Sequence, residues 1–267
     1  MKKLLTITAI SMALIQSLWA DLGEMREKIS QATIEDKKEV NSIDFMKKKA
    51  LENAKKRAIG GDINSQHALG SMYYLGTVIK VDYEKALKWF KKAAKSGHTK
   101  AQYDLAYMYY EGRGVQKNYE KALKWFKKAA NQGDIKAQVY LADMYYEGKG
   151  VEIDYKKAFY WYETTAALDY AKSQYKLADM YFDGKGLPKN YKKSAFWFEK
   201  ASKQSYADAQ YRLGLMYIAG DGVKKDMKKA KKLTRQAYLN GSEDAIDVLK
   251  NQAWKIPKPI KAIYLDE

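Results

Sequence analysis

The sequence contains no cysteine, and this absence limits the chemistry that the chain can perform. Without thiols, the protein cannot form disulfides, use a cysteine nucleophile or bind a metal through thiolates. Histidine is almost as scarce, because only His67 and His98 occur. His67 falls on an expected helix and His98 at the start of another, so capping or surface roles are favoured over metal ligation. The sequence therefore predicts neither a metal site nor a cofactor.

Proline is also rare, with three residues among 267, whereas 46% of the residues are hydrophobic and 30% are charged. This composition provides for a substantial core and excludes a chain that is disordered by composition. Lysine and arginine outnumber aspartate and glutamate by 49 to 32, which gives a formal net charge of +17. We therefore expect one elongated, strongly basic domain.

A pattern of 36 residues recurs along most of the chain without insertion or deletion. Five copies, which we number repeats 1 to 5, begin at Ser65, Ala101, Ala137, Ser173 and Ala209, and Ala245 opens a sixth that stops early. A fixed period of this length is typical of a solenoid, in which each unit packs on the next.

Each repeat contains two stretches with the apolar spacing of a helix, named here helix A and helix B. In repeat 3, Ala137 and Leu141 lie on one face of the expected helix A, and Gly148 marks its end. Asp154 is expected to cap helix B, whose apolar face begins with Ala158. Small and large residues alternate on these faces, so each repeat leaves an apolar surface that only its neighbour covers. A single repeat should not fold alone.

The shared pattern A-Q-x-x-L-[GA]-x-M-Y-x-x-G-x-G-V-x-x-[DN]-Y-x-K-A-x-x-W-[FY] resembles the Sel-1-like repeat family, which is related to tetratricopeptide repeats. The resemblance covers most of the chain. It implies an all-α fold, a right-handed α/α solenoid of five full helix-turn-helix repeats with half-repeat caps and with helix A on the concave side. It also implies a role in holding protein partners together rather than in catalysis.

Several positions depart from the pattern. Asp169 and Ser205 replace the glycine that ends helix B in other repeats, and a left-handed cap costs more without glycine. We expect those two turns to differ. In repeat 5, Leu233 and Thr234 replace the tryptophan and the aromatic residue that follows it in helix B.

The two ends of the chain differ from the repeats. Residues 1–20 combine Lys2 and Lys3 with an apolar run that ends at Leu18, and Ala20 precedes Asp21. This pattern predicts a secretory signal peptide and export to the periplasm or beyond. Leu18 stands where a small residue is preferred before the cut, so an uncleaved N-terminal membrane anchor is the alternative.

The remaining boundaries follow from the repeat register. Residues 21–43 indicate a polar linker or marginal helix, and 44–64 a half-repeat equivalent to helix B. Five repeats follow over 65–244, at 65–100, 101–136, 137–172, 173–208 and 209–244. Residues 245–267 indicate a capping helix and a tail, because Pro257 and Pro259 prevent the helix from continuing.

Two short motifs suggest chemistry, and neither is supported by its context. Ser173 and Lys176 match the S-x-x-K of penicillin-recognising enzymes, and some cysteine-rich relatives of the resembled family are linked to β-lactams. However, Ser173 occupies a packed position filled by alanine in other repeats, and no S-D-N or K-T-G partner occurs. Gly112 and Gly114 form a G-x-G that turn geometry explains better than a phosphate cradle. We therefore expect no catalytic residues and no enzymatic activity.

Two features recur at the same place in each repeat. The glutamines are Gln66, Gln102, Gln138, Gln174 and Gln210, and the tyrosines are Tyr109, Tyr145, Tyr181 and Tyr217. We expect the amides to satisfy backbone groups between helices rather than to form a ligand ladder. We expect the tyrosines to belong to the core rather than to a platform for stacked bases.

The fourth, seventh and eleventh residues of each repeat vary most, and they share one face of helix A. We expect this face to be exposed and to form a groove for a protein or peptide. Its candidate residues are Asp104, Tyr107, Glu111, Tyr140, Asp143, Glu147, Lys176, Asp179, Asp183, Arg212 and Leu215. Six acidic and two basic side chains give the groove a net charge of −4 and favour a cationic partner surface.

Helix B is cationic instead, through Lys88, Lys91, Lys92, Lys95, Lys124, Lys127 and Lys128. The leading hypothesis is an exported interaction scaffold. The alternatives are an enzyme acting on β-lactams or cell-wall peptides, and a non-enzymatic binder of anionic envelope polymers or lipid surfaces through the helix-B lysines. Nucleic acid is not an expected partner, because the chain carries an export signal.

Overall fold

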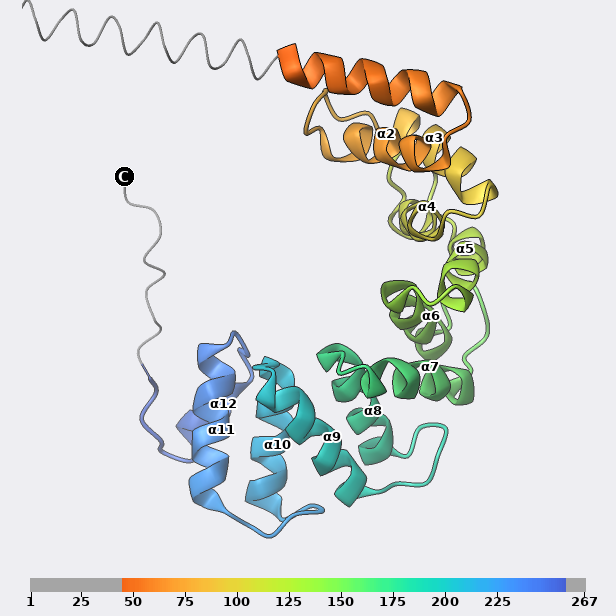
Figure 1. Cartoon of the computed structure of the whole chain (residues 1–267). Helices are drawn as coiled ribbons and strands as arrows, with labels where there is room; N and C mark the ends of the chain where they lie inside the picture. Colours follow the sequence, from red (N-terminus) through yellow and green to blue (C-terminus); the bar gives the residue numbers. More distant parts are fainter. Residues whose placement is uncertain (1–44, 258–267) are drawn as a thin grey trace, which may run out of the picture. The chain divides into compact units, whose positions relative to one another are not determined.

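The computed structural model describes residues 45–257, and this part of the chain folds into α-helices without strands (Figure 1). After a helix over 45–59, the elements are α2 (Ile63–Leu75), α3 (Tyr83–Lys95), α4 (Thr99–Glu111), α5 (Tyr119–Asn131), α6 (Ile135–Glu147), α7 (Tyr155–Ala167), α8 (Ala171–Asp183), α9 (Tyr191–Lys203), α10 (Ala207–Ala219), α11 (Met227–Leu239) and α12 (Ala245–Asn251). The expected all-α repeat solenoid is confirmed. The predicted signal peptide and the polar linker lie outside the described residues, as does the end of the tail.

The chain divides into two compact units, Met1–Val81 and Asp82–Glu267. In the described part of the first unit, the helix over 45–59 and α2 are joined by a hydrogen bond from Gln66 Nε2 to the carbonyl of Ala58, at 3.2 Å. In the second unit, each helix from α3 to α11 packs against the helix that follows it. Even-numbered helices from α2 to α10 are helices A, and odd-numbered helices from α3 to α11 are helices B.

Local sequence fixes where these helices begin and end. The Asp154 carboxylate accepts a hydrogen bond from Lys157 N at 3.0 Å and caps α7, as its position predicts. Gly148 ends α6 with a left-handed φ of 72°. His98 Nδ1 accepts a hydrogen bond from Ala101 N at 3.1 Å, which confirms a capping role for this histidine.

The second loop glycine is required by a close approach between consecutive repeats. A Cβ atom at Gly150 would lie 2.5 Å from the backbone of Tyr119, at the start of the helix B that precedes it. Gly150 also has a φ of 69°, which disfavours other residues. Turn and packing geometry therefore accounts for the G-x-G pattern.

The two turns that lack glycine keep the backbone geometry of the others. Asp169 and Ser205 adopt left-handed φ angles of 59° and 62°. The hydrogen bond from Tyr170 N to Thr165 O, at 3.2 Å, corresponds to that from Asp134 N to Ala129 O, at 3.1 Å. The expectation that these turns differ was wrong, because the surrounding repeat imposes the conformation despite its local cost.

The core runs continuously from one repeat to the next. One buried cluster combines Ala178 of α8, Phe198 of α9, and Leu213 and Met216 of α10, which belong to two consecutive repeats. Of the repeated tyrosines, Tyr109, Tyr145 and Tyr181 are buried and Tyr217 is partly buried, which confirms their place in the core. Each repeat therefore completes its apolar core only with its neighbour.

The repeated glutamines join the ends of consecutive helices B. Gln102 Nε2 on α4 donates to the carbonyl of Ala94 on α3 at 3.2 Å, and Gln102 Oε1 accepts from Gln132 Nε2, at the end of α5, at 2.7 Å. The same two bonds are made by Gln174 with Ala166 and Gln204, and by Gln210 with Ser202 and Asn240. The predicted structural role of these amides is confirmed.

Repeat 3 makes only half of this connection. Gln138 Nε2 donates to the carbonyl of Ala130 at 3.1 Å, but Gln138 Oε1 is buried without a hydrogen-bond partner. Leu168 stands at the position of Gln132 and has no group to donate, and its side chain is 58% exposed. A buried acceptor without a partner lowers stability.

Leu168→Gln is therefore expected to stabilise the protein by about 1 kcal/mol, because it supplies the missing donor while removing little buried apolar surface. The midpoint of thermal unfolding, followed by circular dichroism, should rise by about 2–4 °C. The matched change Gln132→Leu should lower the midpoint, because it leaves Gln102 Oε1 without its donor. A Leu168→Gln protein that melts at or below the wild-type temperature would contradict this account.

Candidate partner-binding surface

The candidate groove residues lie on α4, α6, α8 and α10, on a surface that we call the helix-A face. Their exposure is uneven: Glu111, Glu147 and Asp183 are exposed, Asp143 is buried, and Asp104, Tyr107, Tyr140, Lys176, Asp179, Arg212 and Leu215 are half-buried. The expectation of a uniformly exposed face was therefore wrong. Several of these side chains connect neighbouring repeats.

Asp143 is 6% exposed and ties three helices together. Its carboxylate accepts a hydrogen bond from the Tyr162 hydroxyl on α7 at 2.5 Å and pairs with Lys172 Nζ on α8 at 2.6 Å. Burial, together with the neighbouring carboxylate, raises the pKa of Tyr162 above its usual range, so the phenol stays protonated and donates. Repeats 1, 2 and 4 have phenylalanine at the position of Tyr162. Asp143 is thus a structural residue.

Asp179 holds the equivalent position in repeat 4, and it connects α8 to α10. Arg212 Nη2 on α10 lies 3.1 Å from Asp179 Oδ1, in an ion pair that lacks the alignment of a hydrogen bond. The Asp179 side chain is 16% exposed, and burial raises its pKa although Arg212 opposes that shift. The Arg212 guanidinium also lies over the Phe182 ring, 4.8 Å from its centroid. Sequence spacing identified this shared face but not the neighbouring helix that covers part of it.

Lysines from the loops bring positive charge to the same surface. Lys149 Nζ donates to the Tyr110 hydroxyl at 2.8 Å and pairs with Glu147 at 2.7 Å, contacts that raise the pKa of Lys149. Lys185 repeats this arrangement with the Tyr146 hydroxyl at 2.8 Å. Four cations that the sequence analysis did not place here, Arg113, Lys149, Lys172 and Lys185, contact side chains of this face. They offset the negative charge that was expected of it.

A group of tyrosines forms the aromatic part of the helix-A face. Tyr103, Tyr107 and Tyr140, which we call the tyrosine cluster, are all half-buried. The rings of Tyr103 and Tyr107 are stacked 6.2 Å apart, and the ring of Tyr140 meets that of Tyr107 edge-on at 5.8 Å. Tyr140 also stacks at 4.9 Å on the buried ring of Phe126, which fixes its orientation. Burial raises the pKa of Tyr140 to about 12, so its hydroxyl remains protonated near neutral pH.

Tyr103 was not among the expected site residues. It lies four positions before Tyr107 on the same helix, so i, i+4 spacing was the signal that would have identified it. The contact of both residues with Tyr140 joins α4 to α6 of the next repeat. Only the packing of consecutive repeats reveals that contact.

The repeat pattern of the chain matches the model of a known protein family. The Sel1 repeat model covers residues 63–98, 99–134, 135–170, 171–206 and 207–242, and each match begins at the first residue of a helix A. The chain belongs to the Sel1 repeat family. Proteins built from Sel1 repeats generally act as scaffolds for protein–protein interaction. No curated protein matches the chain.

Two crystal structures of Sel1 repeat proteins are similar to it. A protective antigen of uropathogenic Escherichia coli with an SLR fold is 32% identical, with a TM-score of 0.71, over 78% of this chain and 46% of its own. A Sel1 repeat protein from Oxalobacter formigenes is 36% identical, with a TM-score of 0.65, over 77% of this chain and 59% of its own. The chain thus spans about half the length of these relatives.

The helices B of the Sel1 repeats carry the expected lysines. The helix-B lysines of α3 and α5 are all exposed, and two of them lie over tryptophan rings of their own helix. Lys92 Nζ is 4.6 Å from the Trp89 ring centroid, and Lys128 Nζ is 4.8 Å from that of Trp125. These contacts hold the indole rings beside exposed lysines.

The serine of the S-x-x-K match is buried, and residues 45–257 contain no cluster of metal-ligating side chains. Ser173 is 0% exposed and accepts a hydrogen bond from the Thr165 hydroxyl at 2.7 Å, so its S-x-x-K match presents no accessible nucleophile. This part of the chain contains no group of three or more histidine, aspartate and glutamate residues that could hold a metal ion. None of its helices is long and apolar enough to span a bilayer.

The buried network of Asp143 leads to a stability prediction. Asp143→Ala is expected to lower the free energy of unfolding by about 2 kcal/mol, because it leaves the buried Tyr162 hydroxyl without an acceptor. Adding Tyr162→Phe should recover part of this loss, since other repeats have phenylalanine there. Urea unfolding followed by circular dichroism measures both effects.

Asp183→Ala provides the control, because the Asp183 side chain is 40% exposed and lies on the same surface. It should change stability by no more than about 0.5 kcal/mol. Equal stabilities of the Asp143→Ala and Asp183→Ala proteins would show that the buried network of Asp143 contributes nothing to the free energy of unfolding.

Proposed function

We propose that the protein is an exported, non-enzymatic scaffold that binds a protein or peptide partner on its helix-A face. The observation that carries this proposal is the half-buried tyrosine cluster of α4 and α6. Tyrosine is among the residues that contribute most to binding when they lie near the centre of an interface. Membership of the Sel1 repeat family supports the general role, and the cluster supports the choice of surface.

The tyrosine cluster is suited to binding because its rings are already ordered. Tyr103, Tyr107 and Tyr140 hold one another in stacked and edge-on contacts, so little side-chain entropy remains to be lost on association. Glu111 lies exposed at the end of the same helix, and the Arg113 guanidinium is 5.5 Å from the Tyr107 centroid. An apolar side chain flanked by a cationic group would complement the ring faces and Glu111.

Export is supported by the sequence of residues 1–20, with their paired lysines, apolar run and Ala20 before Asp21. We place the scaffold in the periplasm or outside the cell. Retention of the segment as an N-terminal membrane anchor is the alternative. In either case the partner would be found outside the cytoplasm.

Site-specific photo-crosslinking in the protein's own cells tests the surface and the compartment together. A photoreactive residue at position 107 is expected to give a discrete protein adduct in the envelope or secreted fraction, whereas one at Lys124 on helix B should not. Adducts formed only from position 124 would place the partner on the lysine surface instead. Adducts confined to the cytosol would rule out the exported role.

The same adduct allows a matched mutational test. Once the partner is identified, Tyr107→Ala should weaken its affinity by about tenfold, measured by titration with purified protein, because a central aromatic anchor is lost. Tyr160→Ala removes an exposed tyrosine of α7, a helix B outside the helix-A face, and should leave affinity near the wild-type value. Equal losses in the two variants would remove the cluster from the interface.

The enzymatic alternative is not favoured, because the Ser173 hydroxyl is buried and engaged with Thr165. Purified protein is expected to show no turnover of a chromogenic β-lactam above the uncatalysed rate. Turnover that disappears in Ser173→Ala, with the fold intact by circular dichroism, would instead establish a hydrolase.

A further inference from the structure

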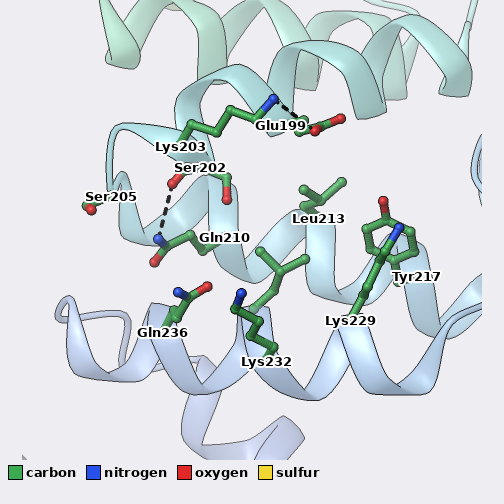
Figure 2. A pocket seen from close by; sticks show the side chains of 11 residues that line it. Glu199, Ser202, Lys203, Ser205, Gln210, Leu213, Tyr217, Lys229, Lys232 and Gln236 are labelled. Carbon is green, nitrogen blue, oxygen red and sulfur yellow. Dashed lines mark hydrogen bonds and ion pairs between the residues drawn. The ribbon is translucent and has the colours of Figure 1, made fainter.

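A hollow lies at the junction of repeats 4 and 5. It has a volume of about 380 Å³, within the usual range of ligand pockets, and lies among α9, α10 and α11. Its lining includes Leu213, Leu233 and Tyr217, and the side chains of Lys229 and Lys232 extend from α11 toward α10 (Figure 2).

The repeat register shows why repeat 5 differs here. Leu233 stands where the four preceding repeats have Trp89, Trp125, Trp161 and Trp197. Trp197, the nearest of these, packs on the same apolar cluster as Leu233. In three of these repeats a lysine three residues further on lies over the indole ring, at 4.6, 4.8 and 5.1 Å from its centroid. The corresponding residue of repeat 5 is Gln236, so both the ring and its cation are replaced.

Cationic groups nevertheless surround the hollow. Lys203 pairs with Glu199 at 3.0 Å. Lys229 Nζ lies 5.2 Å from the Tyr217 ring centroid, and neither Lys229 nor Lys232 forms an ion pair with a carboxylate in the described part of the chain. Two ammonium groups without acidic partners therefore border a hollow in which Leu213 and Leu233 lie among polar side chains.

We infer that this hollow binds an aromatic side chain that a protein partner presents beside carboxylates. The aromatic ring takes the place of the missing indole, over Leu213 and Leu233. Lys232, which lines the same hollow, supplies the cation–π contact that another lysine provides in other repeats. The partner's carboxylates pair with Lys229 and Lys232. This site is independent of the tyrosine cluster, since it lies on other helices and recognises the opposite charge.

The probe for this site is a pentapeptide of sequence Asp-Glu-Trp-Asp-Glu with blocked ends, titrated calorimetrically into the full-length protein. Replacement of its tryptophan by alanine is expected to weaken binding by about tenfold, because burial of the ring and the cation–π contact are lost. Equal binding of the two peptides would reduce the site to non-specific attraction of negative charge and overturn the inference.

Leu233→Trp provides the decisive variant, because it restores the residue found in the other four repeats and fills the hollow from within. It should remove binding of the tryptophan peptide while the protein melts no lower than the wild type. Undiminished binding by a folded Leu233→Trp protein would show that the peptide binds elsewhere.

Charge is tested with a matched pair of lysines. Lys232→Glu should weaken binding by about tenfold, whereas Lys124→Glu, the equivalent position of repeat 2, should leave it unchanged. Equal losses would indicate attraction to the whole lysine surface and contradict a site in repeat 5. Tyr107→Ala should also leave this binding unchanged, so the result is independent of the proposed helix-A partner.

The chain itself has an aromatic residue near acidic ones at Tyr264, Asp266 and Glu267. If Tyr264→Ala in the full-length protein raised affinity for the probe about tenfold, the protein's own residues would be the occupant and the external partner would be excluded. We expect no such increase.

Discussion

Burial of each helix between its neighbours along the chain is the constraint on which the rest of the second unit depends. The cluster that joins Phe198 to Leu213 and Met216 crosses from one repeat into the next, so no repeat has a core of its own. The glutamine on helix A strengthens the same junction, because its amide binds the ends of two successive helices B. Apolar packing supplies the driving force, and these polar bonds fix the register.

Strict periodicity follows from this dependence. Gly150 lies so close to the backbone of Tyr119 that a larger residue would displace the preceding helix B. Asp169 and Ser205 accept a left-handed conformation rather than alter the turn. A change of loop length or cap in one repeat would misalign the buried faces of two, and the array therefore tolerates local strain in preference to a shift of register.

Function, in this arrangement, depends on the positions where repeats differ. The tyrosine cluster joins Tyr107 of repeat 2 to Tyr140 of repeat 3, on neighbouring helices A. The position of Tyr107 is held by Asp143 and Asp179 in repeats 3 and 4, and the position of Tyr140 by Arg212 in repeat 5. Those three side chains tie helices together instead. The hollow among α9, α10 and α11 lies where repeat 5 has Leu233 in place of the tryptophan of the other repeats. Two surfaces of different chemistry thus result from side-chain changes on a single repeated backbone. One carries tyrosine rings and carboxylates, and the other carries ammonium groups beside Leu213 and Leu233.

The sequence by itself determined the repeat length, the order of helices, their caps and the structural role of the repeated glutamines. These features are local or periodic: an Asp154 cap is encoded within three residues, and a glutamine that recurs every 36 residues meets the same backbone each time. Exposure of the helix-A face was decided only by tertiary structure. Helical spacing placed Asp143 and Asp179 on the correct face, but whether a side chain there meets solvent depends on Lys172 or Arg212 from the next repeat. The sequence already shows Leu233 as an exception to the repeat pattern. The hollow beside it exists only because α9, α10 and α11 pack together. Periodicity does not specify that contact, because the residues involved are distant in the chain.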